Sequence, residues 1–256
     1  MDRAEWVDTH GHLFLLEDDP SDVLERARAA DVSWMVCPGI DVASSERSRS
    51  IAAAHPDTVL WSAGLHPHSA TEWPDAADRI AELAAEADAV GECGLDFYRD
   101  LAPRDHQIAA FRAQLDIAEA LRKPIIIHCR DAFSAVHDEI ESRGLGELAV
   151  LHCWTGGPKW TRRFRDLGVV FSFAGPLTYT TGDTLRLGAG QAPPERTMVE
   201  TDSPYLTPEP KRSEANEPAN VTLTGAVLAQ VWGMEVDAVA RLTTATAARV
   251  FGRHDE

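Results

Sequence analysis

Two histidines near the start of the chain, His10 and His12, have a spacing that suits metal binding. They lie in an apolar-led segment, Glu5–Leu13, which predicts a strand. Side chains two positions apart on a strand share a face, so both imidazoles and the Asp8 carboxylate are expected to point the same way. Imidazole nitrogens are common zinc ligands, and a nearby carboxylate can orient them. Because a short His-X-His pattern is a weak signal, its interpretation depends on the rest of the chain.

Further histidines and charged groups follow other short apolar segments. They are His66, His68, Glu92, Asp96, His128, Arg130, His152, Glu200 and Asp202. Each has an ordinary alternative: His128 and His152 could be hydrogen-bonded core histidines, and Glu92 could shape a turn between glycines. Asp202 could form an Asx-turn before a proline. Their recurrence at the ends of successive apolar segments instead favours one shared metal site.

Eight short segments rich in Val, Ile, Leu and Trp predict strands. They cover Glu5–Leu13, Ser33–Ile40, Val59–His68, Ala89–Asp96, Pro124–Arg130, Leu148–Trp154, Val169–Gly175 and Thr197–Pro204. Their spacing of roughly 20–35 residues is typical of strand–helix units. The helices expected around them are Ser21–Ala30, Ser44–Ala54, Asp75–Ala87, His106–Leu121, Phe133–Arg143, Pro158–Leu167, Val221–Val231 and Val236–Val250.

Strands that alternate with helices in this way predict an α/β fold, a (β/α)8 TIM barrel, as a single domain over residues 1–256. Such barrels have about 250 residues and carry their active sites at the carboxyl ends of the strands. The histidines and carboxylates would then meet at one face. A doubly wound open sheet is the alternative, but it usually has a glycine-rich phosphate loop after the first strand, where this chain has His10 and His12.

The composition, with 44% hydrophobic and 25% charged residues, is that of a globular protein. A net charge of −17 argues against a broad basic surface that coats duplex DNA, and it is compatible with binding divalent cations. The four cysteines form no CxxC pair and suit buried thiols in a reducing compartment. Residues 1–19 do not resemble a signal peptide and no apolar stretch reaches membrane-spanning length, so we expect a cytoplasmic protein without a membrane partner.

The donor types narrow the choice of metal. Imidazole with carboxylate suits Zn, Mn, Fe or Ni, whereas Mg prefers more oxygen ligands. The predicted ligands do not distinguish among these five metals. Two ions held close together need a bridging anion. Some related barrel hydrolases use a carboxylated lysine, but none of the three lysines ends the fourth predicted strand. Glu92 is therefore the expected bridge between two divalent ions.

Six segments, in order, resemble the TatD family of metal-dependent deoxyribonucleases. They read DTHGHL, GLHPH, GECGLDFY, PIIIHCRDA, LHCWTG and ETDSPYL, and the likeness runs from about Val7 to Phe251. The resemblance implies a TIM barrel that hydrolyses DNA phosphodiester bonds with divalent metals. By position, it also implies that His10 and His12 bind a first metal. Glu92 would be the bridge, with His128 and His152 as ligands of the second metal.

The resemblance implies roles for Asp202 and His66, and the two-metal mechanism and the position of Glu200 suggest roles for Arg130 and Glu200. Asp202 would be the last carboxylate ligand, and it could orient a metal-activated water and accept its proton. His66 would lie near the scissile phosphate. Arg130 could stabilise negative charge in the transition state or pair with a carboxylate instead. Glu200 would either support Asp202 from the same strand face or bind a further ion.

Aromatic and basic residues fall in or beside the loops expected on the catalytic face. They are Phe97, Tyr98, Arg99, Trp154, Lys159, Trp160, Arg162, Arg163 and Tyr205. Such a mixture suits the unstacked bases of a single strand, and we expect Trp154 and Tyr205 to contact substrate. The alternative is that Trp160 and Phe164 pack inward while the arginines of the same helix form a solvated face.

These observations favour an exonuclease acting on single-stranded DNA ends. A related barrel hydrolase of a small phosphoester, C–N or lactone bond is the alternative, because one fold hosts many chemistries. Two features keep it open: the net charge, and Ala215, where the family often has an arginine before Asn-Glu-Pro. A non-catalytic binding module is disfavoured by the full ligand set. The sequence does not distinguish DNA from RNA as the substrate. It also fixes neither the direction of digestion nor the oligomeric state.

Overall fold

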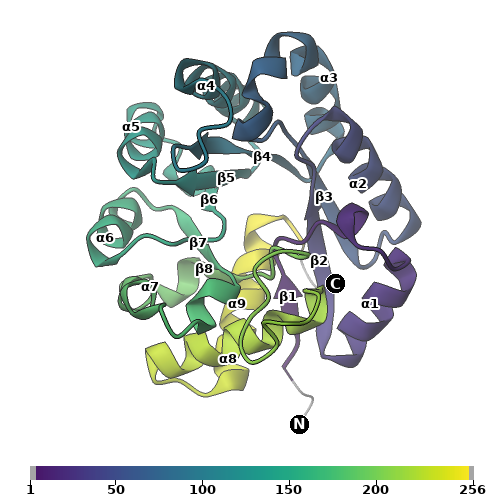
Figure 1. Ribbon diagram of the computed structural model, residues 1–256, viewed down its shortest axis with the longest axis vertical. Helices are drawn as coiled ribbons and strands as arrows, with labels where there is room; N and C mark the ends of the chain where they lie inside the picture. The colour runs from purple at the N-terminus through teal and green to yellow at the C-terminus, as the bar shows by residue number, and fades with distance from the viewer. Residues whose placement is uncertain (1–3, 254–256) are drawn as a thin grey trace.

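Eight parallel strands form a barrel with helices around it, as Figure 1 shows for the computed structural model, which describes residues 4–253. The strands are β1 (Trp6–Asp8), β2 (Val32–Pro38), β3 (Val59–Ala63), β4 (Ala89–Asp96), β5 (Ile125–Arg130), β6 (Ala149–Leu151), β7 (Val170–Phe173) and β8 (Thr197–Val199). They pair in chain order. Backbone bonds from Thr9 N to Val199 O (3.2 Å) and from His12 N to Ser203 O (2.8 Å) join the last strand to the first. The predicted TIM barrel is confirmed.

The helices follow the strands around the barrel (Figure 1). They are α1 (Pro20–Ala29), α2 (Val42–Ala54), α3 (Trp73–Glu86), α4 (Arg104–Leu121), α5 (Phe133–Arg143), α6 (Pro158–Asp166), α7 (Asp183–Ala189), α8 (Val221–Trp232) and α9 (Val236–Val250). Eight of them match expected segments, but the short α7 was not predicted. Among residues 4–253, none of the helices combines the length and apolarity needed to cross a bilayer.

Several strands end earlier than the sequence predicts. β1 ends at Asp8, β3 at Ala63 and β8 at Val199, so the His-X-His, His-Pro-His and Thr-Asp-Ser-Pro segments lie in the loops that follow. The prediction that His10 and His12 share a strand face is therefore wrong. Backbone contacts between two loops hold them instead, because Asp202 N donates to His10 O (2.8 Å).

Helix α9 covers the amino-terminal end of the barrel. Side chains from the strands, among them Val36 and Met198, form one buried cluster with Ala247 and Phe251 at the carboxyl end of α9. Phe251 meets Trp34 edge-on, with ring centroids 6.4 Å apart. This packing closes one end of the barrel, so the carboxyl ends of the strands are the end available for chemistry.

A bulge in β4 directs Glu92. Val90 pairs with Ile125 and Cys93 with Ile127, so β4 has two residues where β5 has one. Gly94, which follows the bulge, has φ +131°, and a Cβ there would lie 2.0 Å from the His128 carbonyl oxygen. Only glycine allows β4 and β5 to approach so closely here.

Replacing Gly94 by alanine is therefore expected to lower the free energy of unfolding by about 3 kcal/mol or more, through the clash and the strained φ. Gly233 is a matched control, because it also has a positive φ (+63°) but nothing lies within 4 Å of its added Cβ. Gly233→Ala should lose only about 1–2 kcal/mol. Urea unfolding measures both. Equal losses would show that the approach of β5 does not require glycine at position 94.

Candidate metal centre

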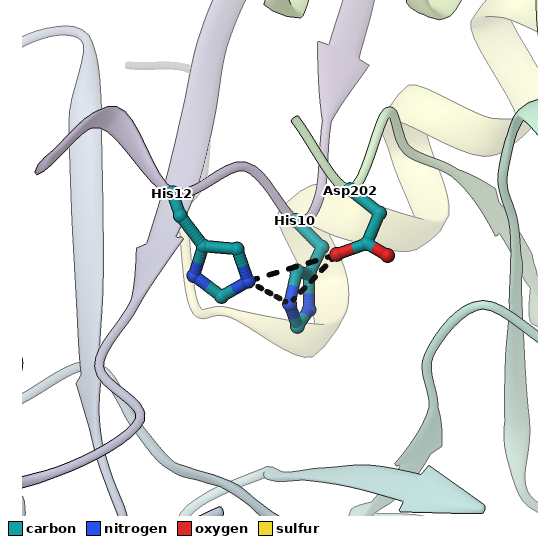
Figure 2. Close-up of side chains that lie close together, drawn as sticks. All are labelled: His10, His12 and Asp202. Atoms are coloured by element: carbon teal, nitrogen blue, oxygen red, sulfur yellow. Dashed lines mark hydrogen bonds and ion pairs between the residues drawn. The ribbon is translucent and has the colours of Figure 1, made fainter. Parts of the chain in front are cut away.

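Three of the predicted ligands form a first donor group at the barrel mouth, His10, His12 and Asp202 (Figure 2). The two Nε2 atoms lie 3.3 Å apart, and Asp202 Oδ1 is 3.8 Å from His10 Nε2 and 3.6 Å from His12 Nε2. Asp202 is the most exposed of the three, with 14% of its side chain accessible. Loops far apart in the sequence thus place three donor atoms around one point.

A second donor group lies beside the first and contains Glu92, His128 and His152. Glu92 Oε1 is 2.9 Å from His152 Nε2 and 3.1 Å from His128 Nδ1, and these two nitrogens are 3.3 Å apart. The other oxygen, Glu92 Oε2, is 3.2 Å from His10 Nε2. Glu92 therefore presents one oxygen to each donor group, as a bridging carboxylate would.

The spacing of these atoms fits metal ions. Ligands at about 2.0–2.2 Å from one ion are separated by about 2.9–3.6 Å at tetrahedral or octahedral angles. The separations above lie between 2.9 and 3.6 Å, except for the 3.8 Å between Asp202 Oδ1 and His10 Nε2. Buried charges of this kind are normally paired or bound to metal. The residues present therefore fit two neighbouring divalent ions.

A family model described as TatD related DNase matches residues 7–252. The chain belongs to this family. The "Uncharacterized metal-dependent hydrolase YabD" of Bacillus subtilis is 33% identical over 95% of this chain and 98% of its own length. The 3'-5' ssDNA/RNA exonuclease TatD of Pantoea ananatis is 36% identical, covering 91% of this chain and 94% of the relative.

A solved structure of the TatD homologue YJJV from Escherichia coli k12 superimposes with a TM-score of 0.88 at 24% identity, covering 97% of this chain and 98% of that one. A TatD-family hydrolase from Entamoeba histolytica gives a TM-score of 0.87 at 18% identity, with 99% and 100% covered. These likenesses show the TatD barrel. The family match and the relatives of more than 30% identity show that the chain is a metal-dependent hydrolase that uses divalent metal.

Acceptors behind the ligands of this TatD site select which nitrogen faces the mouth. The Pro38 carbonyl lies 3.1 Å from His12 Nδ1, and Glu200 Oε1 lies 3.2 Å from His152 Nδ1. Because a carbonyl oxygen only accepts, His12 Nδ1 must donate, which leaves a lone pair on Nε2 for metal. Glu200 holds His152 in the same way. It also accepts from Cys153 N (2.7 Å), and with His10 and His152 it forms a further group of possible donors.

Asp96 is the outer partner of His128, a role that the sequence analysis did not assign. Its Oδ2 atom lies 3.3 Å from His128 Nε2 and 2.9 Å from His68 Nε2. Its Oδ1 atom accepts from Tyr98 N (3.0 Å) and Arg99 N (2.8 Å). One buried carboxylate therefore joins a histidine of the second donor group to the loop after β4. The signal for this role was its position at the end of β4.

Asp8 connects β1 to the loop after β8. Its Oδ1 accepts from Thr201 N (2.8 Å) and His10 N (3.2 Å), and its Oδ2 from Thr201 Oγ1 (2.6 Å). Burial raises the pKa of Asp8 to about 8, although these hydrogen bonds work in the opposite direction. Asp8 thus orients the backbone of His10, whereas the prediction had it orienting the imidazoles.

The charge environment favours the metal-binding form of Glu92. Burial by itself would raise the pKa of Glu92, but His152, His66 and His10 hold it well below its usual range. Burial lowers the pKa of His66 to about 4, so this imidazole is neutral near pH 7. His66 Nε2 lies 3.4 Å from Glu92 Oε1 at the edge of the second donor group.

A cleft of about 550 Å³ covers the donor groups and is lined by His66, Arg130 and Tyr205, among others. Trp154 departs from its expected role as a substrate contact. It is 1% exposed in the core, where its indole nitrogen donates to Thr161 Oγ1 (2.9 Å). Trp160 and Phe164 pack against the core and the arginines of α6 are exposed, so the structure favours the alternative for that helix.

A separate group of possible ligands, His137, Asp138 and Glu141, lies on α5. Both carboxylates are largely exposed, and Arg163 Nη2 is 3.5 Å from His137 Nδ1, so a cation already occupies this neighbourhood. This α5 group, with its exposed carboxylates, therefore serves as a control for the buried donor groups at the barrel mouth.

Glu92→Gln is expected to lower metal content and to cut turnover by at least about 100-fold, because the bridging charge is lost while the shape is kept. Asp96→Asn, which changes an outer partner, should cost about 10–100-fold. Glu141→Gln makes the same change in the α5 group and should alter neither quantity. Metal analysis, initial rates and thermal unfolding are measured together. Full metal content and near-normal turnover in Glu92→Gln would rule out bridging.

Proposed function

We propose that this protein hydrolyses phosphodiester bonds in DNA as an exonuclease acting on single-stranded ends. The observation that carries the proposal is the position of Glu92, which offers one oxygen to each of two donor groups beneath an open cleft. The Pantoea ananatis relative is named a 3'-5' ssDNA/RNA exonuclease, which supports the substrate and suggests the same direction here. A single domain over residues 1–256 and a cytoplasmic location stay predictions.

Two divalent ions would be held by the two donor groups. His10, His12 and Asp202 would bind one, and His128 and His152 would bind the other, with Glu92 between them. When bound, such ions lower the pKa of a coordinated water and offset negative charge on phosphoryl oxygens.

The chain's own groups would handle the proton and the phosphate. Asp202 faces the cleft and can orient the attacking water and accept its proton. His66 and Arg130 line the same cleft, where they can donate hydrogen bonds to phosphate oxygens. Arg130 stacks over the Tyr98 ring, with its guanidinium carbon 4.1 Å from the centroid, and within residues 4–253 no carboxylate forms an ion pair with it. Its charge is therefore available to a substrate.

A small-molecule phosphoester, C–N or lactone hydrolase is the second candidate, favoured by the net charge of −17 and by Ala215. The Asn-Glu-Pro segment itself is used in packing. Asn216 Nδ2 donates to Thr201 O (2.9 Å), and Glu217 pairs with Arg26 (2.7 Å). Two side chains of this segment are thus engaged within the fold.

Metal analysis should find about two divalent ions per chain, as the two donor groups suggest. His12→Ala and His152→Ala remove a ligand from the first and second group respectively, and each should retain about one ion. The measurement is elemental analysis after dialysis, repeated across Zn, Mn, Fe, Ni and Mg. Loss of both ions in each variant would indicate one cooperative site, and no bound metal in the wild type would remove the basis of the proposal.

Single-stranded oligonucleotides should be trimmed faster than duplexes, because a net charge of −17 disfavours contacts along the length of a duplex. End-labelled single-stranded DNA, blunt duplex, RNA and closed circular duplex are compared at equal metal concentration. The label position on the products reports the direction of digestion. Nicking of the circle faster than trimming of the single strand would contradict the proposal, and activity confined to a small ester or amide would favour the second candidate.

A further inference from the structure

Two patches of exposed or half-buried side chains flank the barrel mouth. The β4 lip consists of Tyr98, Arg99 and Leu101 after β4 and Arg130 at the end of β5, and the β8 lip of Tyr205 and Leu206 after β8. All except Tyr98 line the cleft directly, and Tyr98 stacks on Arg130. Tyr98, Leu101 and Tyr205 are 63%, 64% and 54% exposed. Since the strands pair in order from β1 to β8, β4 and β8 lie half a turn apart and the lips face each other across the donor groups.

Each lip is attached to a different donor group. Tyr205 contacts the His12 ring, with centroids 6.4 Å apart, beside the first group. The β4 lip is joined to the second group through Asp96, which accepts from Tyr98 N and Arg99 N while holding His128. A ligand that spans the mouth would therefore meet one lip, the two donor groups, and then the other lip.

The chemistry of the lips differs from that of an ordinary protein surface. Of the five large hydrophobic side chains exposed between residues 4 and 253, three belong to the lips, and two of these are tyrosines. Exposed apolar residues gathered at a cleft mark a binding site. Two arginines stand among them on a chain whose net charge is −17. Flat rings with local positive charge suit unpaired bases and the phosphates between them.

We propose that the mouth holds two consecutive nucleotides, with one base stacked on Tyr205 and the other on the Tyr98–Arg130 pair. The phosphate between them then lies over the donor groups. The inference rests on the proposed function and deepens it. It sets the minimum substrate as two linked nucleotides with both bases unpaired, and it explains a preference for single strands, because paired bases cannot spread to opposite lips.

The test pairs tyrosine variants with substrates that lack one base. A short single-stranded oligonucleotide is prepared intact, with an abasic site at the terminal nucleotide, and with an abasic site at the penultimate one. KM and kcat are measured for wild type, Tyr205→Ala and Tyr98→Ala. Loss of one stacking platform should raise KM by about 5- to 150-fold on the intact strand. Each increase should vanish on one abasic substrate, and the two tyrosines should respond to different positions.

Matched variants separate stacking from disturbance of the metal centre. Tyr205→Phe and Tyr98→Phe keep the ring and should restore KM. Leu187→Ala removes another large exposed side chain, 64% accessible on α7 and outside the cleft, and should change neither constant. Metal content is measured in every variant.

The outcomes distinguish failure of the nuclease function from failure of the two-lip arrangement. If the wild type cleaves none of the oligonucleotides, the proposed function fails. If it cleaves them but a tyrosine variant has no effect on KM, or its effect persists on both abasic substrates, or both tyrosines respond to the same base, the two-lip arrangement is wrong and the nuclease function stands.

Discussion

A single buried carboxylate organises the active end of this barrel. Glu92 lies between 2.9 and 3.7 Å from nitrogen atoms of five histidines, which come from loops and strands spread over most of the chain. A buried charge is costly unless opposite charge or metal compensates it. The elements that hold these histidines must therefore keep them close to Glu92. The β4 bulge and its neighbouring glycines are what direct that carboxylate into the mouth.

The two ends of the barrel have separate tasks. Helix α9 closes the amino-terminal end with apolar packing around Phe251 and Trp34, which stabilises the fold there. The opposite end collects imidazoles and carboxylates whose mutual contacts would not stabilise a protein by themselves. Outer acceptors such as Glu200 and Asp96 set the orientation of the ligands there. Stability can thus be supplied at one end while the other is arranged for chemistry.

The bounds of the buried strand β4 and of the amphipathic helix α5 agree with the sequence prediction to the residue, because the pattern of buried positions indicates both their type and their length. Ordered motifs indicated the candidate ligands, which the structure brings together at the barrel mouth. The arrangement of the ligands was less accessible. His10 and His12 lie beyond β1, where a backbone bond between loops distant in sequence decides their place. Trp154 was expected at the site because it lies two residues after His152. The turn after β6 instead directs its side chain into the core.

The strongly acidic surface also bears on how a polyanion reaches this centre. With 41 acidic and 24 basic residues, the net charge repels phosphate, so attraction depends on local groups of positive charge. Divalent ions in the two donor groups, with Arg99 and Arg130 at the rim, would concentrate positive charge there. A duplex needs favourable contacts along its length to bind, whereas a strand end needs them only where it enters. The same charge distribution would favour a flexible strand end over the length of a duplex in the proposed reaction.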